Sequence, residues 1–268
     1  MTEGHKPVVS RLILDTKANI PFPAAQITIY QPSIYEIGLI GSETQFIIGA
    51  RALTKNYKAF EDNSDLSQLS NFEILMTMIM QKAEEFQKIR KSIEDIFLLI
   101  FPNHKAVFTP QSIMLQSLDE DKKISMIDTN TFDEFADIVF DMFCLSELQG
   151  EHMDEFNPEG DRARAIAEKL KARREFLAER DKERGHDSSL ITLFGKYLDI
   201  LAVGERKDKN VLSQYSVYQL IEEFKRFQLK EAFDYTYKAK LAGATKIKDP
   251  KDWMSDVFIM GDDDDENN

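Results

Sequence analysis

The sequence contains only one cysteine, Cys144, among its 268 residues. A single cysteine excludes an internal disulfide, so packing alone must hold the fold. The first residues, MTEGHK, lack the apolar core of a secretory signal, and both features together predict a reducing compartment. Cys144 lies in the apolar run 142–145, which favours a buried small hydrophobic side chain over a reactive nucleophile.

Long apolar runs and an excess of basic residues are also absent. The longest apolar runs, FEILMTMIM and IFLLIF, fall well short of the roughly 20 residues that a membrane-spanning helix needs. Lys and Arg number 34 against 47 Asp and Glu, which gives a net charge of -13. Because clustered basic side chains bind phosphate backbones, this composition argues against nucleic acid. We therefore expect neither a membrane nor a nucleic acid as partner.

The motifs of common catalytic and cofactor sites are missing as well. The four histidines lie far apart, and only His152 has acidic neighbours, in Glu151, Asp154 and Glu155. Two ligands do not complete a metal site, so a metal-dependent hydrolase is less favoured than either of two roles in protein binding. The glycines form neither a dinucleotide-binding GxGxxG nor a phosphate-binding GK[ST] loop, and no GxSxG motif occurs. The sequence predicts no catalytic residue, no metal and no cofactor.

What the sequence does contain is 43% hydrophobic residues, enough for a substantial core. The order of its patterns predicts an α+β, mostly helical protein. We expect an N-terminal α+β domain at 1–150 that includes a β-hairpin, and a charged connecting helix at 151–189. A small helical C-terminal domain at 190–260 and a disordered acidic tail at 261–268 complete the predicted organisation.

Local patterns place the elements of the N-terminal half. VVSRLIL and QITIY read as two short strands separated by prolines, and Ser33 begins a helix that ends at Gly41. FIIG reads as an extended or buried segment, and 61–70 as a polar loop. Ser70 and Glu73 have the spacing of a capping box, which starts one long helix, or two with a break near Arg90.

A hairpin and a further helix follow. SIMLQSL and KISMI alternate with period two around a polar turn, which predicts two paired strands. Thr131 and Glu134 form a second capping-box pair ahead of a helix. Its apolar face comprises Phe135, Ile138, Val139, Met142 and Phe143.

The C-terminal half contains the most unusual pattern. A helix from about Leu190 is stopped at Gly204, a charged loop follows, and Ser216 with Gln219 begins a long helix that ends at Gly243. That helix carries two apolar stripes rotated relative to each other. One stripe is Val217, Leu220, Ile221, Phe224 and Phe227, and the other is Leu229, Phe233, Tyr237 and Leu241.

A domain this small can hardly bury both stripes. Either a compact bundle sandwiches the helix, or one stripe is open to a partner helix, and the spacing does not say which stripe is core. The candidate partner-binding residues are Phe227, Leu229, Phe233, Tyr237 and Leu241.

Several segments together resemble a known group of proteins. They are QPSIYEIGLIGSETQFIIG, NFEILM, TFDEFADIVFDMF, DRARAIAEKL, LDILAVG, and YSVYQLIEEFKRFQLKEAFDYTYKAKLAGA followed by KDWM. In this order they are similar to tail-assembly proteins of tailed bacteriophages and prophages, a group that includes the baseplate-hub assembly proteins of T-even phages and the chaperones of the tail tape-measure protein. The resemblance covers most of the chain and brings no catalytic residue with it.

The resemblance implies a non-enzymatic role in virion morphogenesis. It predicts a tail-assembly chaperone that acts in the host bacterial cytoplasm and binds the tape-measure protein or baseplate-hub components. The sequence is compatible with a homo-oligomer as well as with a monomer. The alternative is a permanent structural subunit of the baseplate hub, which would remain in the virion. An acidic protein with surplus apolar helix surface suits the first role, because net negative charge keeps such a protein in solution.

The acidic tail gives a first testable prediction. Deleting residues 261–268 should leave the melting temperature nearly unchanged, because repulsion among five adjacent negative charges outweighs any burial they gain. Thermal unfolding of the full chain and the truncated chain measures this. A large drop would mean instead that the tail docks on a basic surface, with the arginines of 162–184 as the first candidate.

Overall fold

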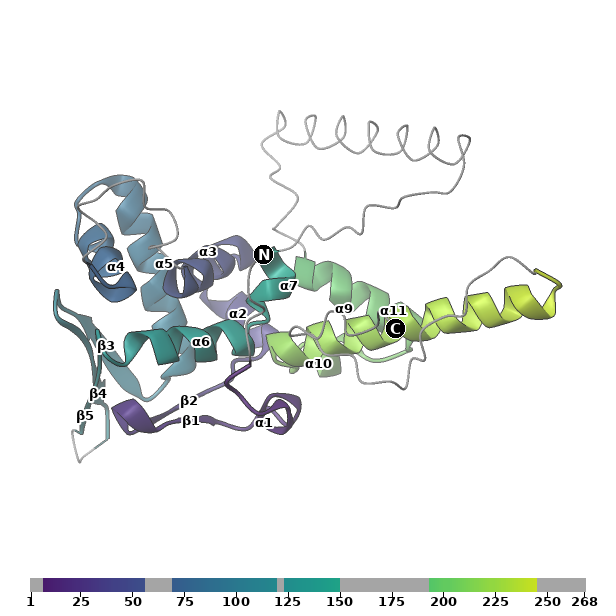
Figure 1. Ribbon diagram of the computed structural model, residues 1–268, viewed down its shortest axis with the longest axis horizontal. Helices are drawn as coiled ribbons and strands as arrows, with labels where there is room; N and C mark the ends of the chain where they lie inside the picture. The colour runs from purple at the N-terminus through teal and green to yellow at the C-terminus, as the bar shows by residue number, and fades with distance from the viewer. Residues whose placement is uncertain (1–6, 56–68, 120–122, 150–192, 245–268) are drawn as a thin grey trace, which may run out of the picture.

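The computed structural model describes residues 7–55, 69–119, 123–149 and 193–244, and these form a mostly helical α+β fold, as predicted (Figure 1). Most of the predicted loop at 61–70, the connecting helix at 151–189 and the acidic tail lie outside the described residues. Within the described residues, no helix is both long enough and apolar enough to cross a membrane.

The chain begins with a short helix and a small hairpin. Helix α1 spans Arg11–Asp15, strand β1 spans Ile20–Phe22, and β2 spans Ile27–Ile29, with the 3-10 turn η1 at Pro23–Ala25 between the strands. The strand predicted for VVSRLIL is therefore wrong. The helix turns Leu14 into the core, and Arg11 pairs with Asp15 one turn later at 3.4 Å. Pro21 lies within β1, which a two-stranded hairpin tolerates because each strand has a free edge.

Two capped helices follow the hairpin. Helix α2 spans Ile34–Ile40 and begins with a capping box between Ser33 and Glu36, which confirms the helix predicted at this place. Helix α3 spans Glu43–Thr54, so the extended segment predicted for FIIG is wrong. The Ser42 hydroxyl accepts a hydrogen bond from the Gln45 N–H and starts this helix three residues before FIIG.

The next helical region is divided in two. Helix α4 spans Asn71–Ile79 and starts at the predicted capping box, and α5 spans Glu84–Ile100. The break lies at residues 80–83 and not near Arg90. Arg90 lies inside α5, where it forms an ion pair with Glu94 one turn along the helix at 2.9 Å.

A three-stranded antiparallel sheet is next in the chain. Its strands are β3 at His104–Phe108, β4 at Ser112–Ser117 and β5 at Ile124–Asp128, in the order β3-β4-β5. The predicted hairpin is confirmed as β4 and β5, while β3 was not predicted.

Helix α6, Phe132–Met142, follows the sheet with its predicted apolar face buried, and α7 spans Leu145–Gln149. The predicted capping box at Thr131 is wrong. The Thr131 hydroxyl accepts the Asp128 N–H at 3.0 Å and so closes the turn before the helix instead.

Three helices end the described chain. Helix α9 spans Leu193–Gly204, α10 spans Lys209–Leu212, and α11 spans Val217–Leu241. The predicted charged loop between the long helices thus contains α10, which Asp208 starts by accepting a hydrogen bond from the Asn210 N–H.

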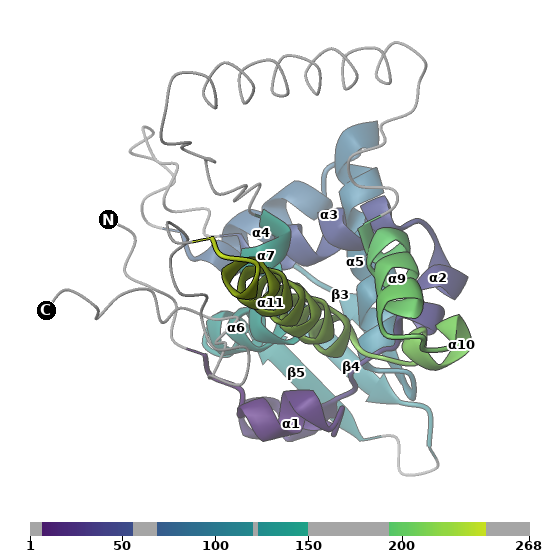
Figure 2. The same ribbon diagram turned by 90° about the vertical axis from the view of Figure 1, so that its right-hand side faces the viewer.

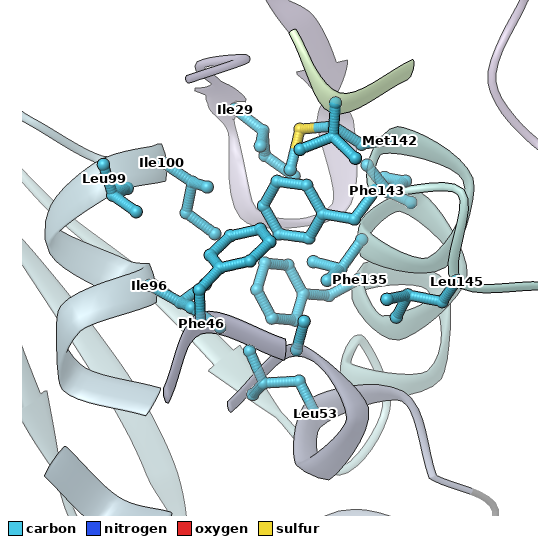
Figure 3. Close-up of a cluster of buried hydrophobic side chains, with 14 of the residues drawn as sticks. Ile29, Phe46, Leu53, Ile96, Leu99, Ile100, Phe135, Met142, Phe143 and Leu145 are labelled. Carbon is cyan, nitrogen blue, oxygen red and sulfur yellow. The ribbon is translucent and has the colours of Figure 1, made fainter. Parts of the chain in front are cut away.

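The buried side chains form one continuous cluster drawn from both halves of the chain. Figure 3 shows Phe46, Phe135 and Phe143 meeting near its centre, and the Phe46 ring lies 4.7 Å from Phe143 and 6.1 Å from Phe194 of α9. These contacts join α9 to the N-terminal helices, while the predicted domain boundaries stay predictions. Cys144 is fully buried, as predicted, and burial raises the pKa of its thiol.

The close approach of α3 and α5 gives a prediction with a matched control. A Cβ on Gly49 would lie 2.7 Å from the Ser92 backbone oxygen, which is far too close. We expect Gly49→Ala to lower the free energy of unfolding by about 1–3 kcal/mol, because the two helices must separate. The control is Gly38→Ala in α2, where nothing lies within 4 Å, and it should be neutral or stabilising. Equal losses in chemical denaturation would contradict this explanation.

Candidate partner-binding site

Helix α11 carries all the residues predicted to bind a partner. The Ser216 hydroxyl accepts the Gln219 N–H at 3.2 Å, and the Gln219 side chain accepts the Ser216 N–H at 2.9 Å, so the predicted capping box is confirmed. The helix runs for 25 residues, about 37 Å at 1.5 Å per residue. It ends at Leu241, two residues before Gly243, whose φ of 92° is a left-handed conformation that favours glycine.

The first turns of α11 are buried in the core. Val217, Leu220 and Ile221 are at most 2% exposed, so the first three residues of the first predicted stripe belong to the core. Glu222 lies beside them at 8% exposure, and its carboxylate accepts hydrogen bonds from Arg11 at 3.0 Å and Arg226 at 3.1 Å. The charge-assisted bond from Arg11 joins the beginning of α11 to α1, and the bond from Arg226 lies within α11.

Further along, α11 packs on α9 through aromatic rings. Phe224 stacks on Tyr197 with the ring centroids 4.1 Å apart. The Phe227 ring lies over Gly204, where a Cβ would come within 2.3 Å of it. Phe227 therefore belongs with the first stripe, against the body of the protein. The sequence indicated Gly204 only as a helix stop, and did not reveal that an aromatic ring packs against it.

A small charged cluster beside this contact was not predicted. The Lys207 ammonium donates hydrogen bonds to Glu205, at 2.9 Å, and to Glu223. Partial burial opposes its charge, but the two carboxylates outweigh that effect and raise the pKa of Lys207. Lys207 also lies over the Tyr215 ring, 5.8 Å from the centroid. The cluster thus joins the α9–α10 connection to the second turn of α11.

Beyond Phe227 no residue of α11 is buried, and Figure 1 shows this part projecting away from the body, while in Figure 2 it points toward the viewer. Leu229 and Phe233 are partly exposed, Tyr237 is 56% exposed and Leu241 is 73% exposed. The Phe233 and Tyr237 rings lie almost parallel, with their centroids 6.3 Å apart. This projecting part therefore presents large apolar side chains to solvent.

These four side chains lie on one broad side of the helix, because each step of four residues turns the direction by only about 40°. Each residue of an α-helix advances about 100°, so Leu229, Phe233, Tyr237 and Leu241 lie on average about 150° around the axis from the first stripe. We call these four residues the outward stripe, because the first stripe faces the core. Tyr235, 78% exposed, has the direction of the first stripe but lies beyond the body. The partner-binding role of the outward stripe stays a prediction.

The described residues offer no comparable arrangement for metal binding. Within 7–55, 69–119, 123–149 and 193–244, no three His, Cys, Asp or Glu side chains gather where they are able to hold an ion. His152 and its acidic neighbours lie outside these ranges.

The fold and the site define a mostly helical α+β protein that displays an apolar projecting helix. Residues 186–258, which include α9, α10 and α11, match the family model described as the YomV second domain. That domain is phage-derived, from YomV of the SPbeta region of a Bacillus phage, so this segment is similar to a phage domain. No curated protein and no solved structure matches the chain.

The two stripes of α11 predict two classes of substitution. Leu220→Ala should lower the free energy of unfolding by about 2–5 kcal/mol, because it removes fully buried methyl groups from the core. Tyr237→Ala should change it by less than about 0.5 kcal/mol, because that side chain is mostly exposed. Chemical denaturation measures both. A comparable loss in Tyr237→Ala would mean that the outward stripe is part of the core.

Proposed function

We propose that this phage-related protein is a non-enzymatic assembly factor whose outward stripe binds an apolar helical segment of a tail protein. The observation that carries the proposal is the solvent exposure of large side chains on the face of α11 directed away from the core. Exposed aromatic and aliphatic residues at helical spacing are typical of surfaces that pair with an amphipathic helix. The tape-measure protein and the baseplate-hub components are the proposed clients.

The shape of the helix supports this role. The outward stripe lies on the part of α11 that projects from the body beyond Phe227, and its side chains are partly or mostly exposed. Stacked aromatic side chains such as Phe233 and Tyr237 are the type of residue that contributes most to interface energy. The site requires no chemistry from the protein beyond this contact.

The charge of the chain suits a chaperone-like function. A protein that covers apolar surface on a client must itself stay in solution, and a net charge of -13 opposes aggregation. We place this activity in the cytoplasm of the infected bacterium, where tails are assembled. A permanent hub subunit would use the same surface, and the two roles differ in whether the chain remains in the virion.

Capture of a client tests the proposal. The full chain is co-expressed with the tape-measure protein or with hub proteins encoded beside it, and complexes are isolated by affinity purification. Phe233→Ala should weaken capture by about tenfold or more, because truncating a central interface aromatic costs upwards of about 1.4 kcal/mol. Tyr235→Ala is the matched control, since it removes an exposed aromatic from another side of the same helix segment.

The outcomes separate the alternatives. Loss of capture in Phe233→Ala, with thermal stability and Tyr235→Ala binding unchanged, supports the proposal. Equal capture by both variants would place the binding surface elsewhere. Proteomics of purified virions then distinguishes the roles, because a chaperone is absent from mature particles and a hub subunit is present.

A further inference from the structure

The distal end of α11 is where the chain leaves the helix, close to the outward stripe. The Gly243 N–H donates to the Lys240 carbonyl at 3.0 Å. The Ala244 N–H donates to the Ala239 carbonyl at 3.1 Å, which completes a Schellman motif. These bonds satisfy the last carbonyls of α11 and end the helix. The residues that follow therefore start within a few positions of Leu241, the last residue of the stripe.

The sequence after α11 has the pattern of one more amphipathic helix. Asp249 and Pro250 are residue types that begin helices, and Gly261 is the type that ends one. Between them, three apolar residues recur at intervals of four and three, which is typical of one helix face. They are Trp253, Val257 and Met260. We call residues 250–260 the apolar segment.

The apolar segment fits the outward stripe in length. As a helix, its 11 residues extend for about 16 Å, and the stripe from Leu229 to Leu241 extends for about 18 Å, at 1.5 Å per residue. The connection at 242–249 has eight residues, within the range of about two to eight that is usual between packed helices. An antiparallel pairing of the apolar segment with α11 thus requires no unusual connection.

The two surfaces carry opposite charge. Residues 228–241 contain three lysines against two acidic residues, a net charge of +1, and Lys230 and Lys240 lie among the stripe residues around the helix axis. Residues 252–266 contain seven acidic side chains and no basic one. Attraction between opposite charges directs the apolar segment towards the stripe. Because exposed ion pairs add little stability, the apolar contact and not the charge holds it there.

The match to the phage domain places the apolar segment in the same unit as α11. The matching residues do not stop at the end of the helix but run to residue 258, 17 residues beyond Leu241. They include Trp253 and Val257. A family model describes residues that occur together in one domain, so most of the apolar segment belongs to the domain that displays the stripe.

We infer that the apolar segment folds back antiparallel on the outward stripe of α11 when no client is bound, and that the client displaces it. This inference rests on the proposed function, because it assigns the regulation of the same surface. A short tether gives the segment an effective concentration in the millimolar range, so a contact too weak to hold two separate molecules together is sufficient here. The segment thereby shields the stripe from other apolar surfaces until a client that binds more tightly arrives.

The single tryptophan of the chain, Trp253, reports directly on the docked segment. In the full chain without client, its fluorescence should lie at shorter wavelength than that of free tryptophan and should resist quenching by acrylamide, because docking removes the ring from water. The double variant Phe233→Ala/Tyr237→Ala should lower the ratio of docked to free segment about a hundredfold, if each stripe ring contributes about a factor of ten. Its emission should therefore shift to longer wavelength and its quenching should increase.

Tyr235→Ala is the matched control, because it removes an exposed aromatic side chain from another side of the same helix. It should leave the emission and the quenching of Trp253 unchanged. Circular dichroism of both variants establishes that each is folded.

Four results would overturn the inference. Trp253 of the parent chain is as exposed as free tryptophan, or Tyr235→Ala exposes it as much as the double variant does. Protection of Trp253 that persists in the double variant would mean that the segment docks elsewhere. Protection that appears only as the protein concentration rises would make a second copy the cover of the stripe.

Capture of the tail protein separates this inference from the proposed function. Trp253→Ala should strengthen capture, because the competing segment then occupies the stripe for less of the time. Unchanged capture by Trp253→Ala would mean that the client displaces nothing. A chain with an exposed Trp253 that still captures the client through Phe233 refutes only the inference. A chain whose stripe holds Trp253 but which captures no tail protein refutes only the proposed function.

Discussion

Burial of the first turns of α11 determines where the rest of that helix points. Leu220 and Ile221 pack in the same core as the aromatic residues of α3, α5 and α6, and the Glu222 carboxylate is held by Arg11 and Arg226. A helix fixed over its first turns is a stiff rod over a further 20 Å or so, because each backbone hydrogen bond holds the next turn. The distal half can therefore project without packing of its own.

The surface residues of α11 differ in kind along its length for the same reason. Near the body, Phe224 and Phe227 lie against Tyr197 and Gly204, and the small residue at 204 lets the two helices approach closely. Beyond this contact the helix retains large apolar side chains although nothing in the core requires them. Large apolar side chains exposed along one helix segment are characteristic of interaction sites in folded proteins.

Elements determined by neighbouring residues could be predicted from the sequence. The helices that begin at Ser33, Ser70 and Ser216 were predicted because each serine satisfies backbone N–H groups within one turn. Thr131 has the same pattern, but its hydroxyl bonds to the preceding turn at Asp128, a competition that spacing alone does not reveal. The helix at FIIG was missed because its Gly49 serves the contact with Ser92 of α5, which lies more than 40 residues away in the chain.

Only part of the candidate site could be predicted from neighbouring residues in this way. Two stripes could be counted from spacing, but the face turned to the core is selected by contacts such as Arg11 with Glu222, which are 211 residues apart in the chain. Those contacts also fix the rotation of the helix about its own axis, and therefore the direction in which its distal side chains point. Insertion of one residue between Phe227 and Leu229 would leave the fold intact and rotate the distal side chains by about 100° around the helix axis. Evolution of this surface is thus constrained in the length of the helix as much as in its composition. The number of residues between the buried first turns and the outward stripe determines the direction in which the stripe faces.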